Sequence, residues 1–230
     1  MAEFSLRGRR ALITGGAGGV GRAIAARLDG HVVVLDLAQG EDAADEAVAA
    51  AAIARAEAVA PLAGWVNNAA VFRDAWLHEE PVLDLITANL ALAVTGCRVA
   101  VRHWLDAERG GAIVNVSSHQ AARPVRGALP YAVAKAAIEG LTRAVAVDYG
   151  PAGIRCNAVA LGSIATARSD ARPELAEAIA RLHPLGRIGT AEEVADVVAL
   201  LLEPGFVSGA IIPVDGGRSV LGHDPEAREL

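Results

Sequence analysis

The 230-residue sequence is poor in cysteine, aromatic residues and lysine. Its two cysteines, Cys97 and Cys156, lie far apart, and no cysteine or histidine pair has the spacing of zinc ligands. These deficits exclude a disulfide-stapled secreted domain and a zinc module, and they favour a reduced, cytoplasmic protein without a bound metal. The sequence also lacks a signal-peptide core and any run of about 18 uninterrupted apolar residues, so we expect no membrane span.

The charge balance excludes a second class of function. The 21 basic and 27 acidic residues give a net charge of -6, and the basic residues form no cluster along the chain. We therefore expect no nucleic-acid-binding surface. With 53% hydrophobic residues, the chain suits a single domain spanning residues 1–230.

Short apolar runs alternate with helix-forming stretches, and several runs are rich in β-branched residues, as in strands buried on both faces. This alternation predicts an α/β fold with a parallel, doubly wound sheet of six or seven strands. The segment between Asp36 and Trp65 has no β-branched run, so the third strand, near residues 38–45, is expected to be reduced or absent. The expected strands are 10–14, 31–36, 64–67, 112–116, 154–159 and 210–214, and the expected helices are 22–28, 42–60, 80–107, 130–149, 174–182 and 191–202.

A glycine-rich loop, residues 14–21, follows the first expected strand and opens a helix. Glycines allow a sharp turn and close approach of a ligand, and the helix N-terminus presents free N–H groups to a pyrophosphate. Asp36 ends the next strand, where a carboxylate can bind ribose hydroxyls and repel a 2′-phosphate. The pattern predicts a site for NAD, with NADP less favoured; the alternative is an ordinary turn and a solvated Asp36.

Tyr131 and Lys135 are four residues apart in a helix-forming stretch, which places both side chains on one face. Lys135 is the only lysine in the chain. An ammonium about 4 Å from a phenol stabilises phenolate by about 4 kcal/mol at an effective dielectric constant near 20, or roughly three pKa units. We therefore expect Tyr131 to be acidic enough to act as a general acid/base, the alternative being a surface pair.

Further residues complete a resemblance to the short-chain dehydrogenase/reductase family, in particular its 3-oxoacyl-carrier-protein reductase-like branch. The family glycine motif matches Thr14, Gly15, Gly19 and Gly21; its N-N-A-G motif appears as Asn67-Asn68-Ala69-Ala70; its Y-x-x-x-K pair is Tyr131 and Lys135. The catalytic serine lies thirteen residues before the tyrosine, which selects Ser118 over Ser117. The chain departs from the family pattern at three places. Ala70 replaces a glycine, and Leu161 replaces a proline. The family's aspartate that contacts adenine has no clear match, and Asp45 is the nearest candidate.

The resemblance implies a Rossmann-type sheet and hydride transfer between NAD and a secondary alcohol or ketone. Tyr131 would exchange the proton, Ser118 would position the substrate oxygen, Lys135 would lower the tyrosine pKa and contact the ribose, and Asn89 would hold a water. The implied catalytic residues are Asn89, Ser118, Tyr131 and Lys135; the implied cofactor-binding residues are Gly15, Gly18, Gly19, Val20, Gly21, Asp36, Leu37, Asn68, Ala69, Ala70, Tyr131, Lys135, Ile164 and Thr166.

Two other functions remain open at this point: halohydrin dehalogenation on the same scaffold, and a non-catalytic dinucleotide-binding sensor or structural subunit. The segment between Thr166 and Pro184, which covers the substrate in this family, is short, and His119 and Gln120 are positioned to line the substrate pocket. We interpret His119 as a loop histidine rather than a second acid/base. The resemblance also implies a homodimer or homotetramer formed through the helices 80–107 and 130–149.

Overall fold

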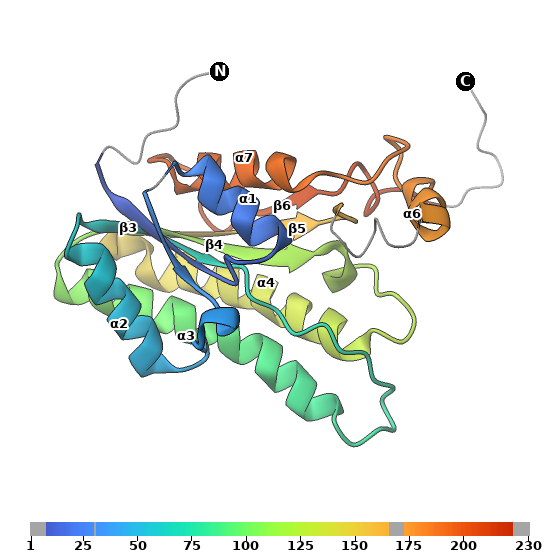
Figure 1. Cartoon of the computed structure of the whole chain (residues 1–230), viewed down its shortest axis with the longest axis horizontal. Coiled ribbons are helices and arrows are strands. Elements are labelled where there is room, and N and C mark those ends of the chain that lie inside the picture. Colours follow the sequence, from blue (N-terminus) through green and yellow to red (C-terminus); the bar gives the residue numbers. More distant parts are fainter. Residues whose placement is uncertain (1–7, 30, 166–172, 223–230) are drawn as a thin grey trace.

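Six parallel strands form one sheet in the order β2-β1-β3-β4-β5-β6 (Figure 1). The computed structural model describes residues 8–29, 31–165 and 173–222. The strands are β1 (Arg10–Thr14), β2 (Val32–Leu35), β3 (Leu62–Asn67), β4 (Gly111–Ser118), β5 (Ile154–Leu161) and β6 (Ile211–Val214). The strand order reverses between β1 and β3, and open α/β sheets bind ligands at the carboxyl ends of the strands at such a point.

Helices cover both faces of the sheet (Figure 1). Helices α1 and α7 pack together on one face, and α2, α3 and α4 lie on the other. The bounds are α1 (Gly19–Arg27), α2 (Glu46–Glu57), α3 (Val82–Asp106), α4 (Leu129–Tyr149), α6 (Pro173–Ala180) and α7 (Ala191–Leu202), with 3₁₀ turns η1 (Leu37–Gln39), η2 (His119–Ala121) and η3 (Gly150–Ala152).

The core consists of two apolar layers separated by the sheet. Leu12 and Trp65 belong to the layer under α2 and α3, whereas their neighbours Ile13 and Val66 belong to the layer under α1 and α7. Successive strand residues thus bury opposite faces, which explains the uninterrupted apolar runs in the sequence. Helix α3 contains an 18-residue window of mean hydropathy 1.5, long enough to cross a membrane. Its Trp104 is fully buried in the core, so we interpret α3 as a core helix.

The predicted α/β fold is confirmed, and the region of the expected third strand contains no strand. The chain forms η1 there, and Asp45 is the N-cap residue of α2, its carboxylate accepting a hydrogen bond from the Ala47 N–H at 2.7 Å. Helix α2 therefore begins at Glu46, whereas the sequence predicted a start at residue 42. Strands β4 and β5 extend beyond the predicted ends, to Ser118 and Leu161, which pair with each other in the sheet.

Candidate active site

The glycine-rich loop after β1 is bound to the end of β3 by hydrogen bonds. The Thr14 hydroxyl oxygen accepts the N–H groups of Asn68 and Ala69, both at 3.1 Å, and the Asn68 side chain donates to the Gly15 carbonyl at 2.9 Å. Gly15 has a φ of +67°, and a Cβ on Gly21 would lie 2.1 Å from the Gly15 oxygen. Only glycine fits at these two positions, so the loop and the start of α1 approach each other closely.

The first residues of α1 form the part of this loop that a phosphate group would contact. Gly18 is the N-cap residue and makes no side-chain cap; Gly19 and Val20 begin the helix. A Cβ on Gly18 would meet no atom within 4 Å, so the backbone is open there. Free N–H groups in such a first turn bind anions. The loop therefore fits the pyrophosphate of a dinucleotide.

A cavity of about 400 Å³ adjoins the loop and contains Asp36. One Asp36 carboxylate oxygen accepts the Ala17 N–H at 2.8 Å and the other accepts the Ala38 N–H at 2.9 Å, which fixes the orientation of the carboxylate. Asp42, which the sequence reasoning missed, also lines the cavity, whereas Asp45 caps α2. The lining residues are Gly15, Leu35, Asp36, Leu37, Glu41, Asp42, Ala43, Ala44, Ala69, Ala70, Val71, Ala88, Ala91 and Leu92.

Tyr131, Lys135 and Ser118 lie together at the carboxyl end of β4. The Lys135 Nζ atom is 5.3 Å from the centroid of the Tyr131 ring and donates a hydrogen bond of 2.6 Å to the Val116 carbonyl. Lys135 is 2% exposed. The Ser118 hydroxyl oxygen accepts the Gln120 N–H at 3.2 Å, and a side-chain hydrogen bond joins Ser118 to Tyr131. The alternative interpretation, an exposed pair at the surface, is therefore wrong, because Lys135 is buried against the Tyr131 ring.

The surroundings of Tyr131 do not favour the expected acidity. Burial raises the pKa of Tyr131 to about 12, and the hydrogen bond from Ser118 offsets only part of this effect. Burial also lowers the pKa of Lys135 from 10.5 to about 8. The prediction considered the attraction between the two groups and omitted their desolvation, which disfavours both charged forms.

Asn89 and Ile164 hold chain segments beside the site. The Asn89 side chain accepts the Val71 N–H at 2.9 Å and donates to the Val71 and Leu85 carbonyls, both at 3.1 Å, so it fixes the segment that follows β3. The water expected at Asn89 stays a prediction. Ile164 forms a β-bridge with Gly189 beyond the end of β5, and Thr166 lies outside the described residues.

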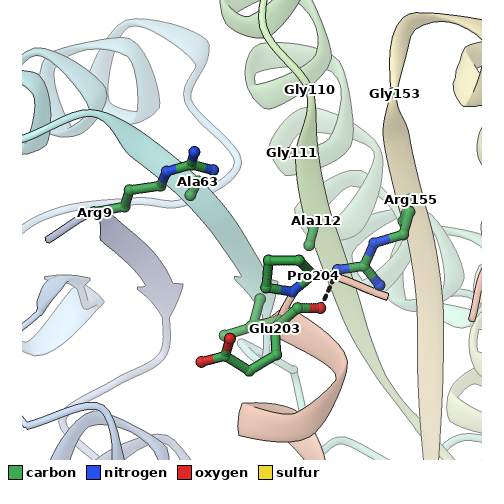
Figure 2. Close-up of a pocket in the computed structure, with 10 residues that line it drawn as sticks. Arg9, Ala63, Gly110, Gly111, Ala112, Gly153, Arg155, Glu203 and Pro204 are labelled. Atoms are coloured by element: carbon green, nitrogen blue, oxygen red, sulfur yellow. Dashed lines mark hydrogen bonds between the residues drawn. The ribbon is translucent and has the colours of Figure 1, made fainter. Parts of the chain in front are cut away.

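A second cavity, of about 240 Å³, lies at the opposite, amino ends of β4 and β5 (Figure 2). Its Arg155 donates hydrogen bonds to the carbonyls of Leu201 and Glu203, at 3.1 and 2.7 Å. These contacts satisfy the carboxyl end of α7, which is a structural role. Within the described ranges no group of three His, Cys, Asp or Glu side chains is arranged to hold a metal ion.

The chain is similar to known proteins over nearly its whole length. A family model described as enoyl-(acyl carrier protein) reductase matches residues 14–219. The chain is 35% identical to the 3-oxoacyl-[acyl-carrier-protein] reductase of Pseudomonas aeruginosa, with 93% of this chain and 98% of the relative covered. The chain belongs to the short-chain dehydrogenase/reductase family. This membership confirms the resemblance identified from the motifs.

Other members of the short-chain dehydrogenase/reductase family extend the similarity. The 3β-hydroxysteroid dehydrogenase 1 of Eggerthella lenta is 32% identical, with 94% of this chain and 95% of the relative covered. The solved structure of ElxO with NADP bound superposes with a TM-score of 0.82 at 25% identity and covers 93% of this chain and 99% of that one. The chain thus belongs to an oxidoreductase family that uses nicotinamide dinucleotides and includes dehydrogenases acting on alcohols.

Proposed function

We propose that this protein is an NAD-dependent oxidoreductase that interconverts a secondary alcohol and a ketone, with Tyr131 as the general acid/base. The observation that carries the proposal is the buried arrangement of Lys135 beneath the Tyr131 ring, with Ser118 hydrogen-bonded to the same tyrosine. Burying an ammonium is unfavourable unless charge develops nearby. A phenol that loses a proton during reaction supplies that charge.

The residues proposed to bind the dinucleotide and those proposed to transfer the proton lie in two different parts of the sheet. The loop at Gly15 and the cavity at Asp36 would hold the dinucleotide, whose nicotinamide ring supplies the hydride acceptor or donor when bound. Ser118 would position the oxygen of the substrate, because its hydroxyl already contacts Tyr131. As a phenol, Tyr131 would donate its proton to the oxygen of the ketone, and the ammonium of Lys135 would stabilise the phenolate left behind. In the reverse direction this phenolate would accept the proton of the alcohol.

The charge of the dinucleotide cavity supports NAD over NADP. Asp36, Glu41 and Asp42 line it, and none of its lining residues is basic. A ribose 2′-hydroxyl can donate a hydrogen bond to the fixed Asp36 carboxylate, whereas a 2′-phosphate would meet the negative charges of Asp36 and Asp42, since Glu41 is paired with Arg55 at 2.7 Å. The relative solved with NADP shows that the fold also accommodates the phosphorylated cofactor, so the proposal depends on the side chains of this cavity.

The proposal is tested with a panel of secondary alcohols with NAD⁺ and ketones with NADH. Tyr131→Phe is expected to lower kcat by at least about 1000-fold, because it removes the proton-transferring hydroxyl, while NADH still binds in a fluorescence titration. Tyr149→Phe is the matched control, since Tyr149 is the only other tyrosine and lies at the end of α4. Activity of Tyr131→Phe within a few-fold of the parent would refute the role.

The same panel separates the two alternatives. NADH binding without turnover of any alcohol or ketone would favour the non-catalytic sensor or structural subunit. Halide release from halohydrins without NAD would favour the dehalogenase. The glycine loop supports the dehydrogenase over the dehalogenase, because a halide site does not require it. The burial of Lys135 beside Tyr131 supports the dehydrogenase over a non-catalytic subunit, because binding a dinucleotide alone does not require this pair.

We also propose that the protein is cytoplasmic and forms a homodimer or homotetramer through α3 and α4. Both cysteines are free and buried, which suits a reducing compartment. A cavity of about 450 Å³ between these helices is lined by the partly exposed Val94 and Leu105. Sedimentation velocity of the parent and of Leu105→Asp tests the assembly: a monomeric parent contradicts it.

A further inference from the structure

Two buried polar atoms directly after Ser118 have no hydrogen-bond partner among the described residues. They are Nε2 of His119 and Oε1 of Gln120, and both belong to η2 at the carboxyl end of β4. His119 is 7% exposed. Buried polar groups are nearly always paired, so two orphans beside the serine expected to position the substrate indicate a place where a ligand binds.

The hydrogen bond on the other side of the His119 ring defines what Nε2 needs. Nδ1 lies 3.2 Å from the carbonyl oxygen of Leu161. A carbonyl only accepts, so Nδ1 carries the hydrogen and Nε2 presents a lone pair in the neutral ring. Burial and then the nearby charge of Arg218 lower the pKa of His119, so the ring is neutral near pH 7. The unpaired Nε2 therefore requires a hydrogen-bond donor.

A second side chain near His119 supplies donors. Nη1 of Arg218 donates a hydrogen bond of 2.6 Å to the hydroxyl of Ser163, and in the part of the chain that the structure describes no carboxylate lies within 4.0 Å of the guanidinium. Asp215 lies nearby, where its carboxylate accepts the N–H groups of Gly217 and Ser219 at 3.0 and 2.8 Å. Among the described residues the guanidinium thus keeps N–H groups without a partner, and the charge of Asp215 offsets part of its own.

An alcohol hydroxyl matches these surroundings better than an anion does. It can donate to Nε2 of His119, and its lone pairs can accept a hydrogen bond from a neighbouring donor at the same time. A carboxylate has no hydrogen to give to Nε2, so it would leave this atom unpaired even though the charge of Arg218 attracts it. The unpaired acceptor therefore favours a neutral, proton-bearing group.

We propose that His119 Nε2 accepts a hydrogen bond from a second hydroxyl group of the substrate, so that the enzyme prefers diols or polyols to mono-alcohols. This inference rests on the proposed function and names its substrate class. His119 acts here as a specificity-determining residue, and Tyr131 keeps the proton-transfer role. The reacting hydroxyl would bind at Ser118, which pairs in the sheet with Leu161, the residue whose carbonyl the His119 ring contacts. The second hydroxyl therefore belongs on a carbon close to the reacting one.

Matched substrate pairs that differ by one hydroxyl test the inference. We expect kcat/KM with NAD⁺ to be at least about tenfold higher for 2,3-butanediol than for 2-butanol, or for 2,4-pentanediol than for 2-pentanol. His119→Asn keeps an amide donor near the Nδ1 position and removes the Nε2 acceptor, so the preference should fall to within about threefold in this variant. His31→Asn is the control, because His31 precedes β2 at the amino end of the sheet.

A binding measurement keeps the test independent of turnover and of the stability of the variant. The ¹⁵N signal of His119 Nε2 in the parent should move when 2,3-butanediol is added with NAD⁺ and stay in place with 2-butanol. Absence of a diol preference, its survival in His119→Asn, a higher kcat/KM for 3-hydroxybutyrate than for 2,3-butanediol, or an unmoved Nε2 signal would each overturn the inference. Equal turnover of diols and mono-alcohols would overturn the inference and leave the proposed oxidoreductase activity intact. A shift of the Nε2 signal on addition of 2,3-butanediol, without turnover of any alcohol, would contradict only the proposed function.

Discussion

Replacing Lys135 by methionine should raise stability while removing activity. Lys135 is 2% exposed, its Nζ donates to the Val116 carbonyl, and no carboxylate in the described part of the chain pairs with it. Methionine has nearly the same length and no charge, so Lys135→Met removes the unfavourable burial of an ammonium. We expect kcat to fall at least about 100-fold, because the phenolate of Tyr131 loses its stabilising charge.

The magnitude follows from the pKa of the buried ammonium. Burial lowers the pKa of Lys135 from 10.5 to about 8, which corresponds to about 3 kcal/mol in the free energy of unfolding. This cost is fully present below pH 8. Between pH 8 and 10.5 the folded chain has lost the proton that the unfolded chain keeps, so the stability of the parent rises with pH. The advantage of Lys135→Met over the parent should therefore shrink by about 2 kcal/mol between pH 7 and 9.5.

Urea denaturation of both proteins at several pH values measures this change. The series stops at pH 9.5, because burial raises the pKa of Tyr131 to about 12 and ionisation of the unfolded tyrosine above pH 10 would add a second pH dependence. Loss of the hydrogen bond to Val116 costs about 1–3 kcal/mol at every pH and leaves the difference between pH values unchanged. Lys135→Arg, which keeps the charge, is the control. A stability difference between parent and Lys135→Met that is constant with pH would refute the reasoning.

Three further predictions concern the loop, the cofactor and the phenol. Gly21→Ala should lower the free energy of unfolding by at least about 3 kcal/mol and abolish NADH binding, because its Cβ would lie 2.1 Å from the Gly15 oxygen. Gly140 is a helical glycine with open space around it, so Gly140→Ala should raise the free energy of unfolding by about 0.5–1 kcal/mol in the same denaturation assay. Asp36→Ala should reduce the ratio of kcat/KM for NAD⁺ over NADP⁺ at least about tenfold, and a parent that already prefers NADP⁺ would contradict the carboxylate argument. In the protein without cofactor, the absorbance difference at 295 nm between the parent and Tyr131→Phe should show no ionisation of Tyr131 below pH 10, because burial raises its pKa to about 12; titration near pH 7 would show that the site is more polar than the structure indicates.

The sequence predicted the strands well because most of them are buried on both faces. β1 was placed correctly, since its apolar run ends at the glycine loop. The ends of β4 and β5 were less predictable: Ser118 and Leu161 pair with each other, and such pairing depends on the neighbouring strand rather than on local apolar residues. Helix α2 was predicted too long, because an alanine-rich stretch favours helix throughout and only the cap at Asp45 fixes its start.

The site was predictable where spacing decides the geometry. Four residues along a helix bring Tyr131 and Lys135 together, and the structure has them together. The cavity residue Asp42 was not predictable, because its place depends on how the chain folds back after η1 in the absence of a third strand. The pKa of Tyr131 was predicted wrongly for a related reason. A linear sequence gives the spacing of two groups, but the desolvation of each depends on every segment that covers it.

The burial of Lys135 supports the proposed enzymatic role. A non-catalytic dinucleotide-binding subunit would gain stability from an apolar residue at position 135, because the ammonium is buried without a carboxylate partner in the described ranges. The chain otherwise uses arginine for its basic residues, yet it keeps one lysine here. Beside a neutral phenol the ammonium gains only its hydrogen bond to the Val116 carbonyl, since burial raises the pKa of Tyr131 to about 12. It becomes favourable only while negative charge is present on the phenol oxygen, which is the state that a proton transfer through Tyr131 creates.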